Sequence, residues 1–557
     1  MDNYQIADQF SLLSKLMDIH GENNFKAKSY ASAAFAIEKL TQPLSEISPE
    51  KIAGIRGIGS SAAQKITALL QTGKLEALEN LIVETPPGVI EMLKIKGIGP
   101  KKIHTIWKEM ELESLGELLY ACKENRLKLY KGFGEKTQQN VAESIAFYFS
   151  QQGNFLYAQM EEVVAALETL LKKEFAENYI QVTGDYKRQL ETITELAFII
   201  NESAQHIQEK INQWQGLQFA ETQKHFVCYN SDAGFKLKIF CAVEQPLLQT
   251  MIATSSSSRF LEAMVQKGFL FSAISGTDES KLFEANGLPY FPAFAREDPA
   301  LLAEASAATR IKHVIKPTDI KGLIHCHSNW SDGSNSLEEM ALAAIAAGLE
   351  YMAISDHSKS AFYAQGLNEE RVAAQQQQID ELNKKLAPFK IFKSIESDIL
   401  NDGSLDYAPE VLKSFDLVIA SVHSNLKMTE EKAMMRLIKA IENPYTTILG
   451  HPTGRLLLSR PGYPVNHAYI VDACAANNVA IELNANPSRL DIDWRFIKMA
   501  LDKNVRISIN PDSHSADTIH YTRYGVLVAQ KALVSPEQNL SCYTLEEFEK
   551  FLSAKKR

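Results

Sequence analysis

The sequence lacks the cysteine spacing, the long apolar runs and the positive charge that would each mark a special class of protein. Its six cysteines are scattered without any CxxC pair, so neither a zinc ribbon nor a disulfide framework is indicated. No uninterrupted apolar stretch approaches the ~18 residues of a membrane span. The start, MDNYQIADQF, lacks the charged and apolar regions of a secretion signal. We therefore expect a cytoplasmic protein in a reducing environment, with no membrane partner.

The chain also has fewer positively charged than negatively charged residues. The 58 Lys and Arg residues are outnumbered by 68 Asp and Glu, which gives a net charge of −10. This balance argues against a generally basic coat for nucleic acid, although it permits local contacts to phosphate. A hydrophobic content of 45% and a charged content of 23% are ordinary for a soluble globular protein. The 557 residues are enough for several domains with their own cores.

Residues 1–150 contain apolar positions at helical spacing, glycine turns, and no strand-like runs. Two turns are alike: AGIRGIGSSAAQKI contains Gly57 and Gly59, and LKIKGIGPKKIHTI contains Gly97 and Gly99. A third, looser copy is LYKGFGEKTQQNV at residues 129–141. Such glycines let the chain turn tightly and expose backbone N–H groups at the start of a helix, which suits a phosphate oxygen.

Lysines accompany these turns. Lys65, Lys101 and Lys102 would add attraction to phosphate without reading bases. Two close copies with the same flanking apolar positions favour a helix-hairpin-helix DNA-binding motif. The alternative is a helical array with ordinary glycine caps. We expect DNA to be a partner, bound through its backbone without sequence specificity.

Residues from about 155 to 310 differ in character. Strand candidates appear at NYIQVTG, LAFIIN, FVCYN and KLKIFCAV, and EEVVAALETLLKKEF is typical of a helix. This mixture predicts a small α/β or α+β domain. A stretch rich in Pro and Ala follows at 284–319, and we interpret its later part as a linker. The predicted domains are residues 1–150, 151–312 and 313–557.

The C-terminal part contains apolar runs that each stop at a polar or metal-ligating residue, about every thirty residues. This period predicts consecutive strand–helix units. We expect a barrel of about seven parallel strands, in which the C-terminal strand ends meet at one face. The runs are GLIHCH, YMAISDH, IFKSIESD, LVIASVH, TTILGH, VAIELN and RISINPDSH.

The strand ends supply six histidines and two carboxylates, and a third carboxylate follows the first strand in NWSDGS. A lone strand-end histidine is more often structural, but this recurrence at one end of a barrel predicts metal ligands. Mixed imidazole and carboxylate ligands suit Zn²⁺, Mn²⁺ or Fe²⁺ better than Ca²⁺ or Mg²⁺ alone. Since one ion cannot use them all, we expect a cluster of about two or three ions. The nine are His325, His327, Asp332, His357, Glu396, His423, His451, Asp512 and His514.

Such a cluster activates water and bridges the oxygens of a phosphate ester. The implied reaction is phosphoester hydrolysis. Arg455, four residues after His451, is a candidate catalytic residue that contacts the phosphate.

The segments HCHSNWSDG, SDH, IESDIL, SVHS, GHPTGR and NPDSH together resemble the PHP (polymerase and histidinol phosphatase) phosphoesterase domain. With the regions before it, the whole chain resembles the bacterial family X DNA polymerases. The resemblance implies that all nine residues above are the family's metal ligands. It also implies a manganese-stimulated 3′-5′ exonuclease acting on DNA in repair. Two departures, Leu323 for a frequent Asp and Pro511 for a frequent Ser, remove no ligand.

The resemblance places the family's nucleotidyl-transfer motif on GDYKRQLETITELAFII. There Gly184, Arg188, Glu191 and Thr192 fit the motif, and Asp185 replaces a serine that would face the triphosphate.

The catalytic carboxylates of that motif do not fit. The first Asp becomes Glu195, the second becomes Ala197, and the third corresponds to Lys238. Nucleotidyl transfer needs two metal ions held by carboxylates. Ala197 offers no oxygen and Lys238 carries a positive charge, so we expect a polymerase fold without polymerase activity.

The sequence thus leads to a metal-dependent 3′-5′ DNA exonuclease with a degenerate polymerase region. One alternative is a working gap-filling DNA polymerase with a PHP exonuclease. Another is a DNA-binding protein whose barrel hydrolyses small phosphate monoesters, which the acidic net charge favours. The expected architecture is multidomain α+β: a helix-hairpin-helix region, a nucleotidyltransferase-like palm and a distorted (βα)7 barrel.

Overall fold

The computed structural model describes residues 1–40, 42–150, 153–176, 178–243, 246–271 and 276–555. These residues form two compact units: residues 1–123 with 127–148, and residues 124–126 with 149–557. The three domains expected from the sequence stay a prediction. The first expected boundary adjoins residues 151 and 152, which lie outside the described residues.

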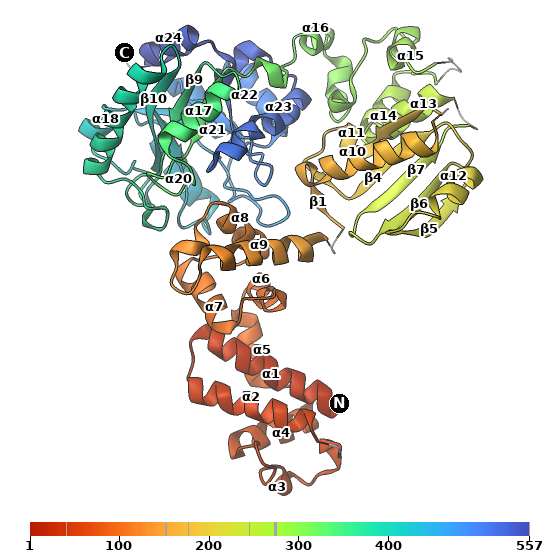
Figure 1. Cartoon of the computed structure of the whole chain (residues 1–557), viewed down its shortest axis with the longest axis vertical. Helices are drawn as coiled ribbons and strands as arrows, with labels where there is room; N and C mark the ends of the chain where they lie inside the picture. Colours follow the sequence, from red (N-terminus) through yellow and green to blue (C-terminus); the bar gives the residue numbers. More distant parts are fainter. Residues whose placement is uncertain (41, 151–152, 177, 244–245, 272–275, 556–557) are drawn as a thin grey trace. The chain divides into compact units, whose positions relative to one another are not determined.

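The first unit is helical, as expected (Figure 1). Its first helix begins with a capping box, in which Asp2 and Gln5 bond each other's backbone N–H groups, and it ends at Gly21 in the left-handed conformation. The elements are α1 (Asn3–His20), α2 (Asn24–Glu38), η1 (Leu44–Glu46), α3 (Pro49–Ile52), α4 (Ser60–Thr72), α5 (Glu76–Glu84), α6 (Pro87–Glu91), η2 (Met92–Lys94), α7 (Pro100–His104), the π-helical turn η3 (Thr105–Glu109), α8 (Leu115–Lys123), η4 (Leu127–Leu129) and most of α9 (Glu135–Ser150).

The glycine turns of this unit share one geometry. Gly57, Gly97 and Gly132 have φ values of +98°, +96° and +93°, which favour glycine. Gly59 and Gly99 then occupy the N-cap positions of α4 and α7, without any side-chain cap. The first N–H groups of α4, and those that follow Pro100 in α7, are therefore available for an external acceptor.

The middle of the chain forms a five-stranded sheet in the order β2-β4-β7-β6-β5. The β4 and β7 strands pair in parallel and the other pairs are antiparallel. The elements are β1 (Phe155–Leu156), α10 (Tyr157–Glu174), β2 (Ile180–Thr183), α11 (Gly184–Lys187), β3 (Thr192–Ile193), β4 (Glu195–Ile200), α12 (Ala204–Ile211), β5 (Leu217–Gln223), β6 (Phe226–Ser231), β7 (Lys236–Cys241), α13 (Leu247–Thr254), α14 (Ser258–Gln266), α15 (Glu279–Ala285), η5 (Ala293–Ala295), η6 (Pro299–Ala303), α16 (Ala307–Lys312) and η7 (Pro317–Asp319).

Both faces of this sheet are covered. In β4, Leu196, Phe198 and Ile200 join one core with α10 and α12, while Ile199 joins the other with α13, α14 and α15. This alternation follows from the two-residue period of a strand. The four strand candidates fall on β2, β4, β6 and β7. The edge strand β5 was missed because it is polar and mostly exposed.

The C-terminal part is a parallel sheet of seven strands in sequential order, as expected. The two end strands also approach each other. An isolated parallel bridge joins Cys326 to Ser513, and the His327 N–H donates to the Ser513 carbonyl at 2.8 Å. The sheet is thus a nearly closed barrel. Its strands are β8 (Gly322–Cys326), β9 (Tyr351–Ile354), β10 (Lys390–Asp398), β11 (Leu417–Ser421), β12 (Thr446–Leu449), β13 (Ala480–Asn484) and β14 (Ile507–Asn510).

Helices pack around these strands. They are α17 (Leu337–Ala346), η8 (Phe362–Ala364), α18 (Glu369–Leu386), α19 (Pro409–Leu412), α20 (Glu430–Ile441), α21 (His467–Asn477), α22 (Trp494–Asp502), η9 (Ala516–Tyr521), α23 (Thr522–Lys531), η10 (Pro536–Gln538), η11 (Leu540–Cys542) and α24 (Leu545–Lys555). Among the described residues, no helix has the length and apolar character needed to span a bilayer.

Within the second unit, polar contacts join the five-stranded sheet region to the barrel. Lys531, at the end of α23, is only 2% exposed, and its Nζ donates to the Arg188 carbonyl at 2.6 Å. Arg495 pairs with Glu191 at 3.2 Å. Burial lowers the pKa of Lys531 to about 8, despite the nearby carboxylates of Glu191 and Glu297.

The depressed pKa of Lys531 predicts a pH-dependent stability cost. The unfolded chain holds this proton up to about pH 10.5 and the folded chain only to about pH 8. The cost is therefore complete below pH 8 and disappears as the pH rises through 10.5. We expect the stability advantage of Lys531→Met over the native protein to shrink by about 2–3 kcal/mol between pH 7 and pH 10.

Urea unfolding of both proteins across this pH range is the measurement. Lys498→Met on α22, where the side chain is 39% exposed, is the matched control. A Lys531→Met advantage that stays constant with pH would contradict the depressed pKa.

Candidate metal centre

The predicted ligands come together at the C-terminal strand ends of the barrel. His325 and Glu396 lie within β8 and β10, and the other side chains come from the segments that follow the strands. None is more than 11% exposed. The barrel topology therefore gathers residues that are far apart in the sequence into one buried cluster.

Glu396 is the centre of this cluster. Its two carboxylate oxygens lie within 3.7 Å of imidazole nitrogens from five histidines. No single carboxylate could hydrogen-bond all of them well, so this crowding is typical of a ligand set. The distances are 3.3 Å to His325, 3.7 Å to His327, 3.0 Å to His357, 3.1 Å to His423 and 3.0 Å to His451.

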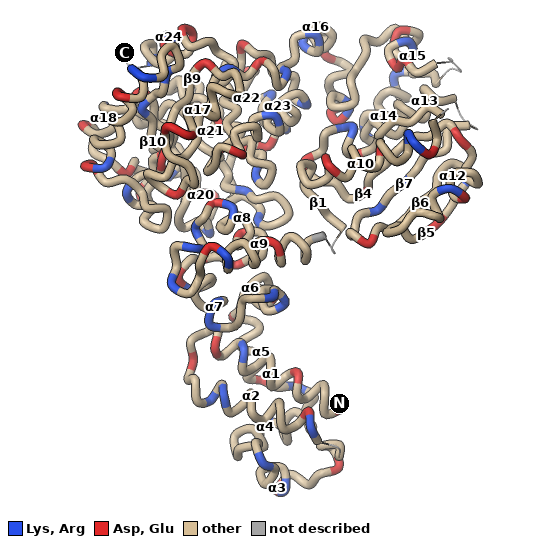
Figure 2. The backbone as a smooth tube through the Cα atoms, viewed as in Figure 1, with Lys and Arg blue, Asp and Glu red and all other residues tan. Residues whose placement is uncertain are grey.

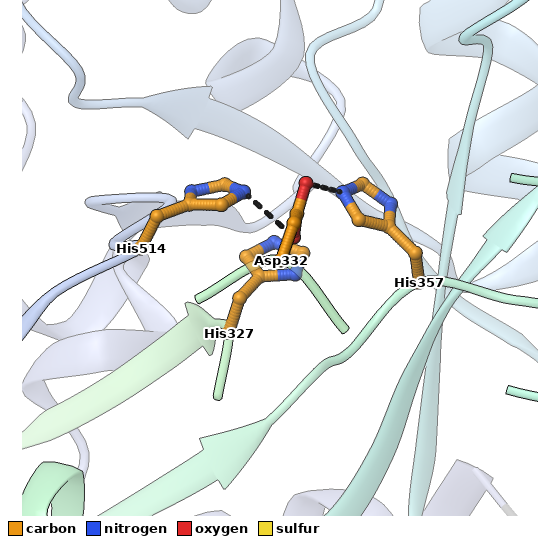
Figure 3. A group of neighbouring side chains, drawn as sticks. All are labelled: His327, Asp332, His357 and His514. Carbon is orange, nitrogen blue, oxygen red and sulfur yellow. Dashed lines mark ion pairs between the residues drawn. The ribbon is translucent and has the colours of Figure 1, made fainter. Parts of the chain in front are cut away.

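Asp332 and Asp512 extend the cluster on the side of His514. Figure 3 shows Asp332 between His514 and His357, at 3.3 Å and 3.6 Å from their Nε2 atoms. Asp512 lies 3.1 Å from the Nε2 atom of His327. The rings of His327 and His514 stack with centroids 4.1 Å apart. Two positively charged rings would repel each other at this distance, so at least one of the two is neutral, as a ligating imidazole must be.

Two of these residues have unusual backbone conformations. His325 has a φ of +62° and Asp512 a φ of +52°, in the left-handed region that side chains disfavour. Strain of this kind costs about 1–3 kcal/mol per residue and tends to occur at functional sites. The first and last strands therefore both present their side chains to the cluster through strained positions.

A further layer of carboxylates orients the histidines. Glu482 on β13 accepts a hydrogen bond from the Nδ1 atom of His325 at 2.6 Å and from the His451 N–H at 2.7 Å. Asp398 accepts from the Nδ1 atom of His423 at 2.6 Å. With Nδ1 so engaged, the Nε2 atoms of both rings face the centre, which is the arrangement of metal-bound histidines. The sequence marked Glu482 and Asp398 as strand-end residues but gave them no role.

Asp356 also has a structural role. Its carboxylate accepts hydrogen bonds from the Ser328 N–H and hydroxyl at 2.8 and 2.7 Å, and from the Ser331 hydroxyl and the Gln375 amide. It thereby holds the loop that carries Asp332.

Charge pairing sets the protonation of the cluster. Burial disfavours the charge on Glu396, but His423 and His325 outweigh burial and hold its pKa well below the usual range. Burial with His514 and His357 nearby lowers the pKa of His327 to about 3. Burial would also lower the pKa of His423, yet Glu396 and Asp398 raise it to about 10. Imidazoles and carboxylates thus exert strong, opposed effects on one another in the absence of any other cation.

The residues fit a metal centre on hydrogen bonding as well. In the described part of the chain, buried atoms without a hydrogen-bond partner gather here, and such atoms are costly unless something binds them. The cluster contains four groups of at least three residues, and within each group the ligand atoms all lie within 4.8 Å of one another. The unpaired atoms are Nε2 of His325 and His514, Nδ1 of His327, His357 and His451, Oδ2 of Asp332 and Oε2 of Glu396.

Arg455 contacts the segment after β13. Its guanidinium donates to the Arg489 carbonyl at 3.0 Å, to the Leu490 carbonyl, and to Asp493 at 2.6 Å. Arg489 itself lies nearer the cluster, with its Nε 3.9 Å from Asp512. The phosphate contact of Arg455 stays a prediction.

The second unit contributes one acid that the sequence did not suggest. Glu124, which belongs to this unit, places its carboxylate 2.6 Å from the Nε2 atom of His514. It forms one of the ligand-atom groups with Asp512 and His514. Since it lies in a helical region with no ligand-like spacing, no sequence signal marked it.

The residues that the resemblance placed in the nucleotidyl-transfer motif lie on or beside β4, β7 and α11. Ala197 pairs in register with Lys238, and the Nζ of Lys238 lies 3.9 Å from the Glu195 carboxylate. Arg188 forms ion pairs with Asp185 and, at 2.8 Å, with Glu297. Burial raises the pKa of Glu195, which weakens it as a metal ligand. Each of the two cations, Arg188 and Lys238, is thus paired with at least one carboxylate.

Comparisons with known proteins agree with this architecture. A family model described as a PHP domain matches residues 324–486. Models described as a helix-hairpin-helix domain and a SAM-like helix-hairpin-helix tandem match residues 1–75 and 89–146. The barrel with its buried cluster therefore defines a phosphoesterase domain of the PHP class, and the helical matches indicate DNA binding.

One similar protein covers nearly the whole chain, and others cover the barrel. The "DNA polymerase/3'-5' exonuclease PolX" of Bacillus subtilis is 30% identical over 555 residues, which is 96% of both chains. A "Probable phosphatase" of Acetivibrio thermocellus is 27% identical over 245 residues, 42% of this chain and 95% of that protein. The chain belongs to the family X DNA polymerases that carry a C-terminal PHP domain, and the resemblance drawn from its motifs is confirmed.

The role of Glu482 can be tested by metal binding. Glu482→Gln keeps the size of the side chain but removes the charge that orients His325. We expect an affinity for Mn²⁺ about 10–100-fold lower, because residues that orient metal-bound histidines contribute on this scale. Calorimetric titration of metal-free protein with Mn²⁺ is the measurement.

Glu350→Gln, outside the cluster, is the matched control. Equal affinities for native protein and Glu482→Gln would show that Glu482 only supports the fold.

Proposed function

We propose that this protein is a metal-dependent phosphodiesterase that removes nucleotides from the 3′ end of DNA during repair. The observation that carries the proposal is the set of buried, unpaired imidazole and carboxylate atoms around Glu396 at the strand ends of a PHP barrel. The relative from Bacillus subtilis is described as both a polymerase and a 3′-5′ exonuclease, which supports DNA as the substrate.

The cluster would hold about two or three divalent ions, with Mn²⁺ proposed and Zn²⁺ or Fe²⁺ as alternatives. When bound, such ions polarise the phosphate oxygens and lower the pKa of the attacking water. The chain's own residues supply the rest. Glu396 and Asp512 hold the histidines at fixed separations, Glu482 and Asp398 fix the orientation of two rings, and burial keeps bulk water out.

The glycine turns at Gly57–Gly59 and Gly97–Gly99 would bind DNA through its phosphate backbone. Helix N-termini without side-chain caps attract phosphate oxygens, and nearby lysines add charge. Figure 2 shows Lys and Arg interspersed with Asp and Glu along this part of the chain. Such local contacts suit binding without sequence specificity.

The polymerase region would be inactive. A two-metal site needs carboxylates on β4 and β7, but Ala197 and Lys238 stand opposite each other there. Arg188, which fits the family motif, is engaged by Asp185 and Glu297. A working gap-filling polymerase is therefore the less favoured function. Hydrolysis of small phosphate monoesters is a second candidate, since the barrel alone is similar to proteins described as probable phosphatases.

A primer–template assay separates these functions. With Mn²⁺ and nucleotides, we expect the native protein to shorten the primer from its 3′ end and never to lengthen it. The variant His327→Ala should lose at least about 100-fold of the shortening rate, since it removes a ligand at the centre of the cluster. Products are resolved on a denaturing gel.

His313→Ala, a histidine outside the cluster, is the matched control. Lengthening that survives in His327→Ala would establish a working polymerase. Release of phosphate from glycerol phosphate with no change in the primer would establish the monoesterase.

The glycine-turn lysines can be tested through salt dependence. In full-length protein, Lys65→Ala with Lys101→Ala should lower DNA affinity equally for different sequences. It should reduce the slope of log affinity against log salt by about 2, since each phosphate contact contributes about one unit. Fluorescence anisotropy with labelled DNA at several salt concentrations gives the slope.

The paired control is Lys172→Ala with Lys550→Ala, both exposed and in the second unit. An unchanged slope in the Lys65 and Lys101 double variant would reject these turns as the phosphate contacts.

A further inference from the structure

A short loop leaves the metal cluster directly after the ligand His357. It runs from Ser358 to Leu367 and returns to its start, where the Leu367 N–H donates to the His357 carbonyl at 2.8 Å. The Gly366 N–H donates to the Ala361 carbonyl at 3.0 Å. A Cβ atom at Gly366 would lie 1.9 Å from the Ser358 carbonyl oxygen, so only glycine allows this closure. The base of the loop is therefore fixed beside the cluster.

The loop is also fixed to the barrel. The Ser360 hydroxyl donates to Asp398 at 2.8 Å, and its N–H donates to Asp406 at 2.6 Å. Asp398 is the same carboxylate that orients His423. Ala361 and Ala364 on either side of the tip are fully buried. The tip consequently has a defined position relative to the metal ligands.

Two aromatic residues, Phe362 and Tyr363, stand at this tip, two and three residues after Ser360. Tyr363 is half-buried, and the Arg126 guanidinium lies 4.2 Å from the centre of its ring. Phe362 is its neighbour, with ring centroids 5.8 Å apart, and is 80% exposed. A large apolar ring displayed on a rigid loop gains nothing for folding, because its surface stays in water. Its position beside a phosphoester-cleaving centre gives it a use.

We propose that Phe362 stacks on the nucleobase of the 3′-terminal nucleotide while the adjoining phosphodiester occupies the metal cluster. This inference rests on the proposed phosphodiesterase function and adds a determinant of substrate class. Every nucleobase has a flat face, so stacking on an aromatic ring tolerates any sequence. A small phosphate monoester has no base to stack, so Phe362 would favour nucleic acid over monoesters.

The kinetic test compares two 3′ ends. One DNA ends in an ordinary nucleotide, and the other ends in an abasic tetrahydrofuran residue joined by the same phosphodiester. For full-length protein with Mn²⁺, Phe362→Ala should lower kcat/KM about tenfold on the ordinary end. On the abasic end, native protein and Phe362→Ala should be equally slow. Phe362→Trp should restore cleavage of the ordinary end.

The control is Tyr469→Ala, which removes another exposed aromatic ring, 64% exposed on α21. It should cleave both ends at native rates. If Phe362→Ala is as fast as native protein on the ordinary end, or loses equally on both ends, the stacking role is wrong, and cleavage of the ordinary end by native protein still supports the phosphodiesterase.

A binding readout separates this inference from the proposed function. DNA with 2-aminopurine at its 3′ end loses fluorescence when that base stacks on an aromatic ring. We expect quenching by His327→Ala, which cannot cleave, and none by the double variant that adds Phe362→Ala. Quenching without any cleavage by native protein would support stacking while rejecting phosphodiester hydrolysis. Equal signals from the two variants would overturn the stacking role.

Discussion

The structure of the C-terminal part depends on the crowding of imidazole nitrogens around the carboxylate of Glu396. Five histidines within 3.7 Å of one buried carboxylate cannot all be satisfied by hydrogen bonds. Neighbouring residues hold these histidines in place. Further carboxylates accept hydrogen bonds from His325 and His423, and the backbone is strained at both ends of the sheet. Such an arrangement needs positive charge to compensate the acids, and bound divalent ions would provide it.

In the middle part of the chain, Lys and Arg side chains compensate the charge of clustered carboxylates. Where the resemblance places the metal-binding carboxylates of a polymerase, this chain has Lys238 beside Glu195 and Arg188 between Asp185 and Glu297. The positive charge is thus built into the chain. Lys531 and Arg495 extend the pairing to the barrel, so this region contributes to the packing of the second unit whether or not it binds a nucleotide.

Much of this architecture could be predicted from the sequence, because the sequence contains two recurring patterns. The apolar runs that end at His or Asp mark parallel strands, and the rule that strand ends converge brings nine residues together without any knowledge of distances. The repeated Gly-x-Gly turns likewise mark the helix starts at α4 and α7. The features that could not be predicted from the sequence show no such recurring pattern. The edge strand β5 lacks an apolar run, and Glu124 reaches His514 from a segment whose sequence is typical of a plain helix. The partners of Arg455 were also beyond the sequence, since they are mostly backbone carbonyls whose positions depend on the fold.

The bridge between Cys326 and Ser513 gives the barrel an unusual property. It is the place where the first and last strands meet, and it lies between His325 and His327 on one side and Asp512 and His514 on the other. The seam of the barrel and the ligand set are therefore one locus. An ion bound there would be held by ligands from both end strands and would stabilise their pairing. Its binding free energy would then also be the free energy by which it stabilises the barrel against separation of these strands.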